Sequence, residues 1–208
     1  AGAMTKATSP SPHTRGPSDH DVRDQIVEAA TEYFSLYGFE KTTVSDLAKA
    51  IGFSKAYIYK FFDSKQAIGE VICGNRLNVI MTVVDQAVMD VESAPERLRR
   101  MFKTLVEAGS QLFFQDSKLY DIARMSASES WPSARAYEAH IKDLIQQTVR
   151  AGRDAGDFER KTPLDETVNA IYLVMRPYSN PLLLQHNLEN AGEAAAQLCN
   201  LILRSLAP

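Results

Sequence analysis

Apolar residues recur every three or four positions over most of the chain, a spacing that places them on one face of a helix. No segment shows the two-residue alternation of a half-buried strand, so the pattern predicts an all-α protein with essentially no sheet. Capping residues, glycines and prolines divide it into about nine helices, at residues 19–37, 44–51, 55–62, 65–91, 93–114, 117–126, 130–155, 162–177 and 190–206.

Two short helices joined by a tight turn are predicted within residues 43–65, TVSDLAKAIGFSKAYIYKFFDSK. Thr43 is placed to cap the first helix, and Asp46 three residues later completes a capping box. Gly52 stands where a helix usually stops. Ser54 is the next N-cap candidate and opens the second helix. The segment therefore predicts a helix-turn-helix.

The second of these helices has two unlike faces. Its apolar side chains, Ile58, Phe61 and Phe62, cluster on one side of a helical wheel and are expected to anchor it. The opposite face and its edges carry small, lysine and tyrosine side chains: Ser54, Lys55, Ala56, Tyr57, Tyr59 and Lys60. Lysine and tyrosine are natural donors to phosphate oxygens. We predict that this face contacts DNA, the alternative being a short helix pair that only packs within an all-α protein.

The charge distribution favours the DNA-binding interpretation. Residues 41–65 contain five lysines and two acidic residues, whereas the whole chain has a formal net charge of −3. Basic charge concentrated in one segment of an acidic protein is typical of a local phosphate-contacting surface.

These residues also carry a family resemblance. The run from Gly38 to Ile68 resembles the N-terminal domain of TetR-type transcriptional regulators, through the pieces Gly38-Phe39, Thr42-Thr43-Val44, Asp46-Leu47-Ala48, Gly52, Ser54-Lys55-Ala56-Tyr57-Ile58-Tyr59, Phe62 and Ser64-Lys65. The match covers about 50 residues with the preceding helix included. Beyond residue 70 only the length and the all-helical plan are similar.

The resemblance implies a role for each matching position. Residues matching Thr43, Tyr59 and Lys65 contact phosphates in such regulators, and those matching Lys55, Ala56 and Tyr57 approach base edges. Ala56 stands where glycine is frequent, and Phe61 where Tyr or His is frequent. These departures put the identity of the DNA site in question but not the mode of binding.

The chain is expected to divide into three parts. Residues 1–18 are rich in Pro, Ser, Thr and Gly and form a predicted disordered arm, which alternatively lies along DNA; residues 1–3 resemble a cloning remnant ahead of Met4. Residues 19–64 form the three-helix DNA-binding unit. Residues 65–208 form a larger helical domain for ligand binding and dimerisation.

Large, pliable apolar residues are frequent in this larger domain. They either fill a core or line a pocket for a small, largely apolar effector, as the resemblance implies. The candidate pocket residues are Met101, Phe102, Leu105, Met125, Trp131, Tyr137, His140, Tyr172, Met175 and Tyr178, with the tyrosines and the histidine as polar groups. The last helix, with the helix before it, is the candidate dimer surface, through Ala194, Ala195, Leu198, Leu201 and Ile202.

The most favoured function is therefore a dimeric DNA-binding regulator, a repressor released from a palindromic operator by a small-molecule effector. The alternatives are a helical ligand-binding protein or enzyme whose N-terminal unit is only structural, and a DNA-binding regulator without a working pocket. No nucleophile motif or paired carboxylates favour catalysis, and no cofactor is predicted.

Other classes of function have little support in the sequence. The four histidines lack metal-ligand spacing, so no metal site is predicted. No apolar run approaches the ~20 residues that span a bilayer, and no signal peptide is recognised, so we expect a cytoplasmic protein that does not associate with membranes. Cys73 and Cys199 lie in apolar helical patterns, which favours buried thiols over redox sensors.

Overall fold

The structure is a computed structural model that describes residues 18–208, and the predicted arm before Ser18 lies outside these residues. All regular structure within them is α-helical, as predicted. The helices are α1 (Asp19–Tyr37), α2 (Val44–Ile51), α3 (Lys55–Tyr59), α4 (Lys65–Met89), α5 (Ala94–Gln115), α6 (Ser117–Glu129), α7 (Pro132–Asp154), α8 (Leu164–Ser179), α9 (Pro181–Leu184) and α10 (Ala191–Leu206).

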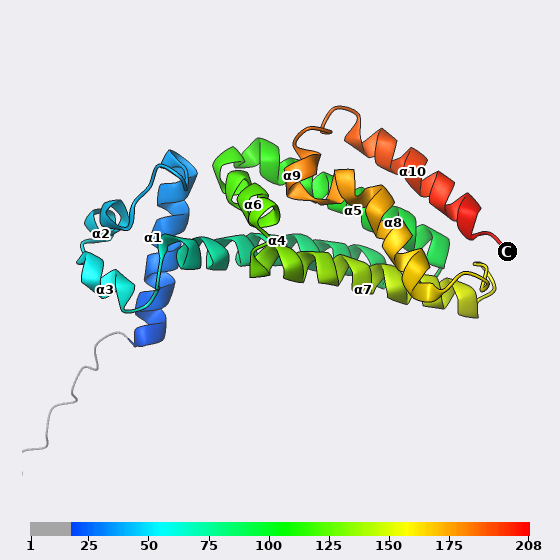
Figure 1. Ribbon diagram of the computed structural model, residues 1–208, viewed down its shortest axis with the longest axis horizontal. Helices are drawn as coiled ribbons and strands as arrows, with labels where there is room; N and C mark the ends of the chain where they lie inside the picture. Colours follow the sequence, from blue (N-terminus) through cyan, green and yellow to red (C-terminus); the bar gives the residue numbers. More distant parts are fainter. Residues whose placement is uncertain (1–17) are drawn as a thin grey trace, which may run out of the picture.

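The helices are arranged as a small unit at one end of an elongated bundle (Figure 1). Helices α1, α2 and α3 form the small unit, and α4 runs from it into the bundle. Within the bundle α4 packs against α5 and α7, α7 pairs with α8, and α10 lies across α5 and α8. The C-terminus is at the end farthest from α1–α3.

Helix α4 joins the two parts and packs one side of its surface into the bundle. By length and composition alone, this helix of 25 residues is apolar enough to cross a membrane. However, α5, α6 and α7 pack against it, and eight of its residues are buried, including Ile68, Ile72 and Leu77. Its apolar character is therefore explained by its central position in the bundle.

Most predicted helix boundaries agree with the structure within a few residues, and the differences have local causes. Ser18 belongs to α1, because its hydroxyl accepts from the Asp21 amide in a capping box. Helix α3 ends at Tyr59, although Phe62 remains buried beyond it. Helix α8 continues through Pro177 to Ser179 instead of ending at the proline.

Glycine is required at two positions in or next to the small unit, Gly52 and Gly69. Gly52 has φ 85° and ψ 23°, the left-handed conformation that ends α2 and starts the turn toward α3. Gly69 in α4 lies directly beneath the ring of Phe39, where an added Cβ atom would be 2.8 Å from the ring carbon Cε2. The absence of a side chain at Gly69 therefore lets the loop after α1 pack on α4.

Candidate nucleic-acid interface

Local hydrogen bonds fix the geometry of the helix-turn-helix. The Thr43 hydroxyl accepts from the Asp46 amide at 3.1 Å, and the Asp46 carboxylate accepts from the Thr43 amide at 2.8 Å. These hydrogen bonds from Thr43 hold the pKa of Asp46 below its usual value. The Ser54 hydroxyl caps α3 by accepting from the Tyr57 amide at 3.1 Å. Both capping residues expected from the sequence thus start a helix.

The two faces of α3 differ in the way that the wheel predicted. Ile58 is completely buried and Phe62 nearly so, which fixes the helix to α1 and α2. Lys55, Ala56 and Lys60 are exposed, and Tyr59 is 42% exposed. The lysine and tyrosine side chains on this face are therefore available to a partner.

Tyr57 is positioned differently from its neighbours on the exposed face. Its ring lies edge-to-face between Phe53 and Phe61, with centroid distances of 5.0 and 5.2 Å. The side chain is half-buried and packs against the core. Tyr57 thus supports the position of α3, and its scope for adjusting to a base edge is smaller than the sequence suggested.

Lys65, which the resemblance gives as a phosphate contact, makes contacts within the protein. Its ammonium donates to the Phe39 carbonyl at 2.8 Å and lies 4.4 Å from the centroid of the Phe39 ring. Partial burial lowers the pKa of Lys65. The side chain therefore joins the start of α4 to the loop after α1, and it presents less free charge than Lys55 or Lys60.

Arg23 of α1 is a contributor that sequence reasoning missed. Its guanidinium donates to the Phe61 carbonyl at 3.0 Å and lies over the Phe62 ring at 4.3 Å. This contact holds the end of α3 against α1. The two segments are 38 residues apart, and no local motif marks the pairing.

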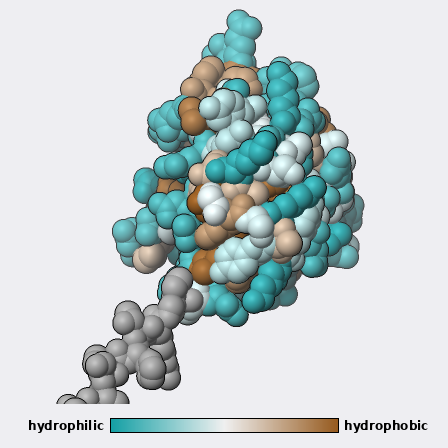
Figure 2. All heavy atoms as spheres, turned by 90° about the vertical axis from the view of Figure 1, so that its left-hand side faces the viewer, coloured by the Kyte–Doolittle hydropathy of each residue, from teal (hydrophilic) through white to brown (hydrophobic). Residues whose placement is uncertain are grey.

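The face of the molecule at this end is mainly hydrophilic, with a smaller hydrophobic area toward its middle (Figure 2). The exposed lysines of the small unit come from the loop before α2, from α2, and from α3 and its end: Lys41, Lys49, Lys55 and Lys60. A polar, locally basic surface of this kind suits a phosphate backbone.

A partly buried polar cluster connects α4 to α6 and α7. The Glu70 carboxylate accepts from the Ser133 amide at 3.1 Å and from its hydroxyl at 2.9 Å. Ser133 is in the first turn of α7, which lacks a side-chain cap of its own, so Glu70 supplies that cap from another helix. The Ser133 hydroxyl is also 2.7 Å from that of Ser126 in α6.

Further contacts connect α1 to the larger domain. The Ser35 hydroxyl donates to Asp116 at 2.6 Å, and Lys118 donates to the Leu36 carbonyl at 2.9 Å. Phe39 packs edge-to-face on Trp131, with ring centroids 5.9 Å apart. A movement of α6 or of the start of α7 would therefore change these contacts with α1 and with the loop after it.

The ten predicted pocket residues do not lie around one pocket. Four are core residues: Met101, Phe102, Leu105 and Met175. Met125 and Trp131 are near the junction with α1–α3, and Tyr178 is half-buried against the core. His140 lies on an outer groove, with its Nε2 atom 2.9 Å from Asp85. The core residues were indistinguishable from pocket residues in the sequence, because both are large and apolar.

Tyr137 and Tyr172 do share a cavity, of about 80 Å³. Helices α4, α6, α7 and α8 enclose it with the turn before α9, and its polar lining includes Arg135, Glu138, Arg176, Ser179 and Asn180. Sequence reasoning missed these polar residues because charged positions on α7 and α8 are usually solvated.

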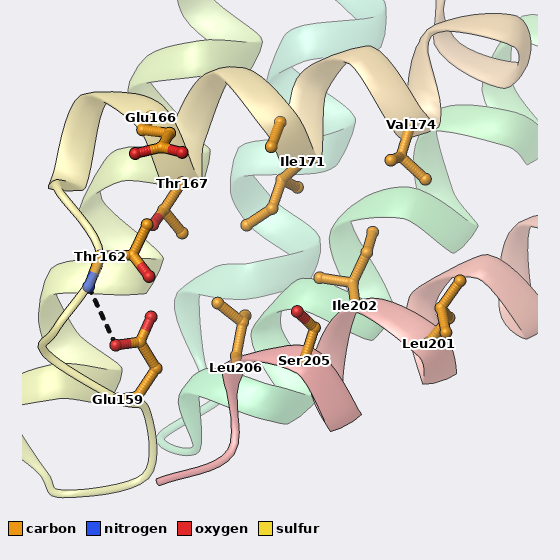
Figure 3. Close-up of a pocket in the computed structure, with 11 residues that line it drawn as sticks. Glu159, Thr162, Glu166, Thr167, Ile171, Val174, Leu201, Ile202, Ser205 and Leu206 are labelled. Atoms are coloured by element: carbon orange, nitrogen blue, oxygen red, sulfur yellow. Dashed lines mark hydrogen bonds between the residues drawn. The ribbon is translucent and has the colours of Figure 1, made fainter.

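Helices α8 and α10 form an exposed apolar surface. Figure 3 shows Ile171 and Val174 of α8 facing a groove shared with Leu201 and Ile202 of α10, with a volume of about 290 Å³. Leu201 and Leu173 are each 54% exposed.

The five residues predicted for the dimer differ in exposure. Ala195 and Ile202 are only 3% and 7% exposed, because they pack inside the monomer, whereas Ala194 and Leu198 are half-buried and Leu201 is exposed. On α8, Leu173 and Val174 are also exposed, and sequence reasoning did not single out these two residues.

The two cysteines are buried, and burial raises the pKa of both thiols, that of Cys199 to about 11. Neither has the exposed, electropositive surroundings of a redox sensor. Among residues 18–208 no group of His, Cys, Asp and Glu is arranged to hold a metal ion.

Comparisons with known proteins agree with this architecture. Residues 26–71 match the bacterial regulatory proteins of the tetR family, and residues 94–199 match the tetracyclin repressor-like C-terminal domain. The uncharacterized HTH-type transcriptional regulator YdgC of Bacillus subtilis is 22% identical over 188 residues, 90% of this chain and 94% of YdgC.

Two further relatives extend the comparison. The negative transcriptional regulator IcaR of the Staphylococcus aureus biofilm operon icaADBC is 41% identical over 49 residues, 24% of this chain and 26% of IcaR. The structure of the Bacillus subtilis transcriptional regulator FadR in complex with stearoyl-CoA has a TM-score of 0.60 at 16% identity, covering 88% of this chain and 97% of FadR. With both domains matched in order along one chain, the protein belongs to the TetR family of bacterial transcriptional regulators.

Proposed function

We propose that the protein is a homodimeric repressor that binds a palindromic operator through α2 and α3 and releases it when a small-molecule effector binds the larger domain. The observation that carries the proposal is the exposed face of α3, where Lys55, Tyr59 and Lys60 surround the small side chain of Ala56. The description of IcaR as a negative regulator supports repression. A DNA-binding protein of this kind acts in the cytoplasm.

Dimerisation is proposed because one short α3 helix contacts too few phosphates for specific binding. A two-fold dimer presents two recognition helices about 34–36 Å apart to successive major grooves. The apolar surface of α8 and α10 supports this assembly, since Leu173, Val174 and Leu201 gain burial only against another molecule.

The effector is proposed to act through the contacts between its cavity and α4. Ser130 lines the cavity, and the next residues along the chain include Trp131 and Ser133, which contact Phe39 and Glu70. A ligand with different affinities for two positions of these segments would shift α4 and the small unit attached to it. The stearoyl-CoA bound by FadR supports ligand control in this fold.

The proposal is tested with DNA from upstream of the protein's own gene. Fluorescence anisotropy should show binding by the effector-free dimer that weakens steeply as salt is raised, because released counterions drive it. Lys60→Ala should reduce the slope, whereas Lys161→Ala, at an exposed lysine just before α8, should not.

A regulator without a working pocket is the second candidate, and the filled core around Met101, Phe102 and Leu105 favours it. The unpartnered hydroxyl of Ser179 in the small cavity argues for the effector instead. Membership of a family of transcriptional regulators argues against the enzyme alternative.

A further inference from the structure

The cavity between α7 and α8 contains a buried hydroxyl group without a partner. The Oγ atom of Ser179 is buried, with 5% of the residue exposed, and it has no hydrogen-bond partner among residues 18–208. The Tyr137 side chain lines the same cavity, and only 7% of the residue is exposed. Buried polar groups in folded proteins are nearly always paired, so the orphaned Ser179 hydroxyl at the cavity wall indicates a bound molecule that supplies the missing partner.

The cavity also has more positive than negative charge. Arg135 and Arg176 line it, are solvent-exposed, and form no ion pair with any residue in the range 18–208. Glu138 is the carboxylate in the lining, and it is paired with Lys142 at 2.9 Å. A ligand that pairs with the two guanidinium groups must therefore carry a negative charge.

The hydroxyl groups are suited to donate to such an anion. Burial raises the pKa of Tyr137 well above its ordinary value and that of Tyr172 to about 12. Both phenols thus remain protonated at neutral pH. Tyr172 is held in place by Lys142, whose ammonium is 4.7 Å from the ring centroid. Two phenols, one serine hydroxyl and two guanidinium groups make the site rich in donors.

The size and the apolar lining restrict the rest of the ligand. One water molecule needs about 10–15 Å³ of such space, so a cavity of about 80 Å³ holds a molecule of only several non-hydrogen atoms. The apolar side chains around it belong to Leu77, Ala123, Ala127, Ala134 and Ile141. These surfaces suit a short hydrocarbon or a single aromatic ring, and they exclude a long chain.

We infer that this cavity binds a small monocarboxylic acid, with the carboxylate near Arg176 and Tyr172 and a short apolar body against α4 and α6. This inference deepens the effector part of the proposed function and rests on it for any effect on DNA. The predicted effector is therefore apolar in its body but anionic at one end.

Calorimetric titration of the full-length dimer with acetate, butyrate and benzoate tests the inference, with acetamide, butyramide and benzamide as uncharged counterparts. At least one acid should bind, and its amide should bind at least ten-fold more weakly. Arg176→Gln should weaken the acid about ten-fold, because a charge-assisted hydrogen bond is lost. Arg150→Gln, at an exposed arginine of α7 away from the cavity, is the matched control and should bind like the wild type.

Ser179→Ala separates binding from folding. The variant should melt at the same temperature as the wild type or higher, because it removes an unsatisfied buried hydroxyl, yet it should bind the acid more weakly. The inference is overturned if no acid binds, if the amides bind equally well, or if Arg176→Gln binds like the wild type.

DNA binding by the ligand-free dimer is measured separately. Retained DNA binding without acid binding would overturn the inference about the cavity but leave the proposed DNA-binding function standing. Acid binding that leaves DNA affinity unchanged would support the site and contradict effector-controlled release.

Discussion

Single side chains on α3 and just after it determine how the protein is expected to bind DNA. Ile58 and Phe62 anchor the helix, and Tyr59 and Lys60 remain outside. Lys65, by contrast, donates to the Phe39 carbonyl and belongs to the junction with α4. Similar residue types on neighbouring turns thus have different roles, which follow from what each side chain touches.

Lys60→Ala should weaken DNA binding to a similar extent on all sequences. The salt dependence, as log Kd against log salt concentration, should flatten by about one unit for the lost phosphate contact. Tyr59→Phe should lower affinity without changing that slope, because it removes a hydroxyl but no charge. Anisotropy titrations at several salt concentrations measure both, and wild-type behaviour of both variants would place the DNA on another face.

Lys65→Ala should destabilise the protein as well as weaken DNA binding. It removes a charge-assisted hydrogen bond of the kind that contributes about 1–3 kcal/mol when buried, and partial exposure places the expected loss near 1 kcal/mol. Urea denaturation measures it, and Lys60→Ala, at an exposed side chain, should show almost no loss. Equal stability of the two variants would contradict the junction role.

At the scale of helices, the sequence predicted the starts of α2, α3 and α5, because capping residues act locally, whereas the short helix α9 was not predicted. Thr43, Ser54 and Ser93 each cap the helix expected of them. What was not predictable depends on contacts between distant segments. Arg23 meets Phe61, and Glu70 caps α7, through pairings that only the packed fold creates.

The candidate sites show the same limit. The exposed face of α3 was predictable because one wheel contains both its apolar and its polar side chains. The effector residues were not predictable, because Met101 in the core and Tyr172 at the cavity are both large residues on the buried face of a helix, and the sequence does not tell core from cavity. The arginines of the cavity, Arg135 and Arg176, resemble ordinary solvated positions until the helices are assembled.

The packing of α4 beneath Phe39 gives a paired prediction. Gly69→Ala should destabilise the protein by about 1–3 kcal/mol, because the new methyl group overlaps the Phe39 ring, which is buried beside Trp131. Gly74→Ala, on the same helix with open space around it, should stabilise by about 0.5–1 kcal/mol. Thermal or urea denaturation measures both, and a stabilising Gly69→Ala would show that α4 is free of this contact.

The capping box of α2 gives a pH-dependent prediction. Hydrogen bonds from Thr43 lower the pKa of Asp46 in the folded state, so its stabilising effect is complete above the unfolded pKa of about 3.9 and is lost as the pH falls through the lower folded value. The melting temperature of Asp46→Ala should therefore lie below that of the wild type at pH 7, and the gap should close under strongly acidic conditions. Asp46→Asn is the control with an uncharged acceptor, and a gap independent of pH would contradict the account.

The whole molecule is organised around α4, which connects the DNA-binding unit to a bundle whose outer surface on α8 and α10 is apolar (Figures 1 and 3). Leu201→Glu or Leu173→Glu should produce folded monomers, because both side chains are already exposed in the single chain. Loss of the second half-site contact should weaken operator binding about 100-fold or more. Val79→Glu, at an exposed position on α4, is the control and should remain dimeric in sedimentation analysis. Dimeric Leu201→Glu protein that binds DNA normally would exclude this surface as the interface.

The central claim is that the exposed face of α3 binds duplex DNA, and its most direct test is a footprint of the full-length, effector-free dimer on the DNA upstream of its own gene. The account predicts two protected half-sites about 10 base pairs apart or a multiple of that spacing, with protection lost in a Tyr59→Phe, Lys60→Ala double variant. Absence of any protected site at low salt, or unchanged protection by the double variant, would contradict it.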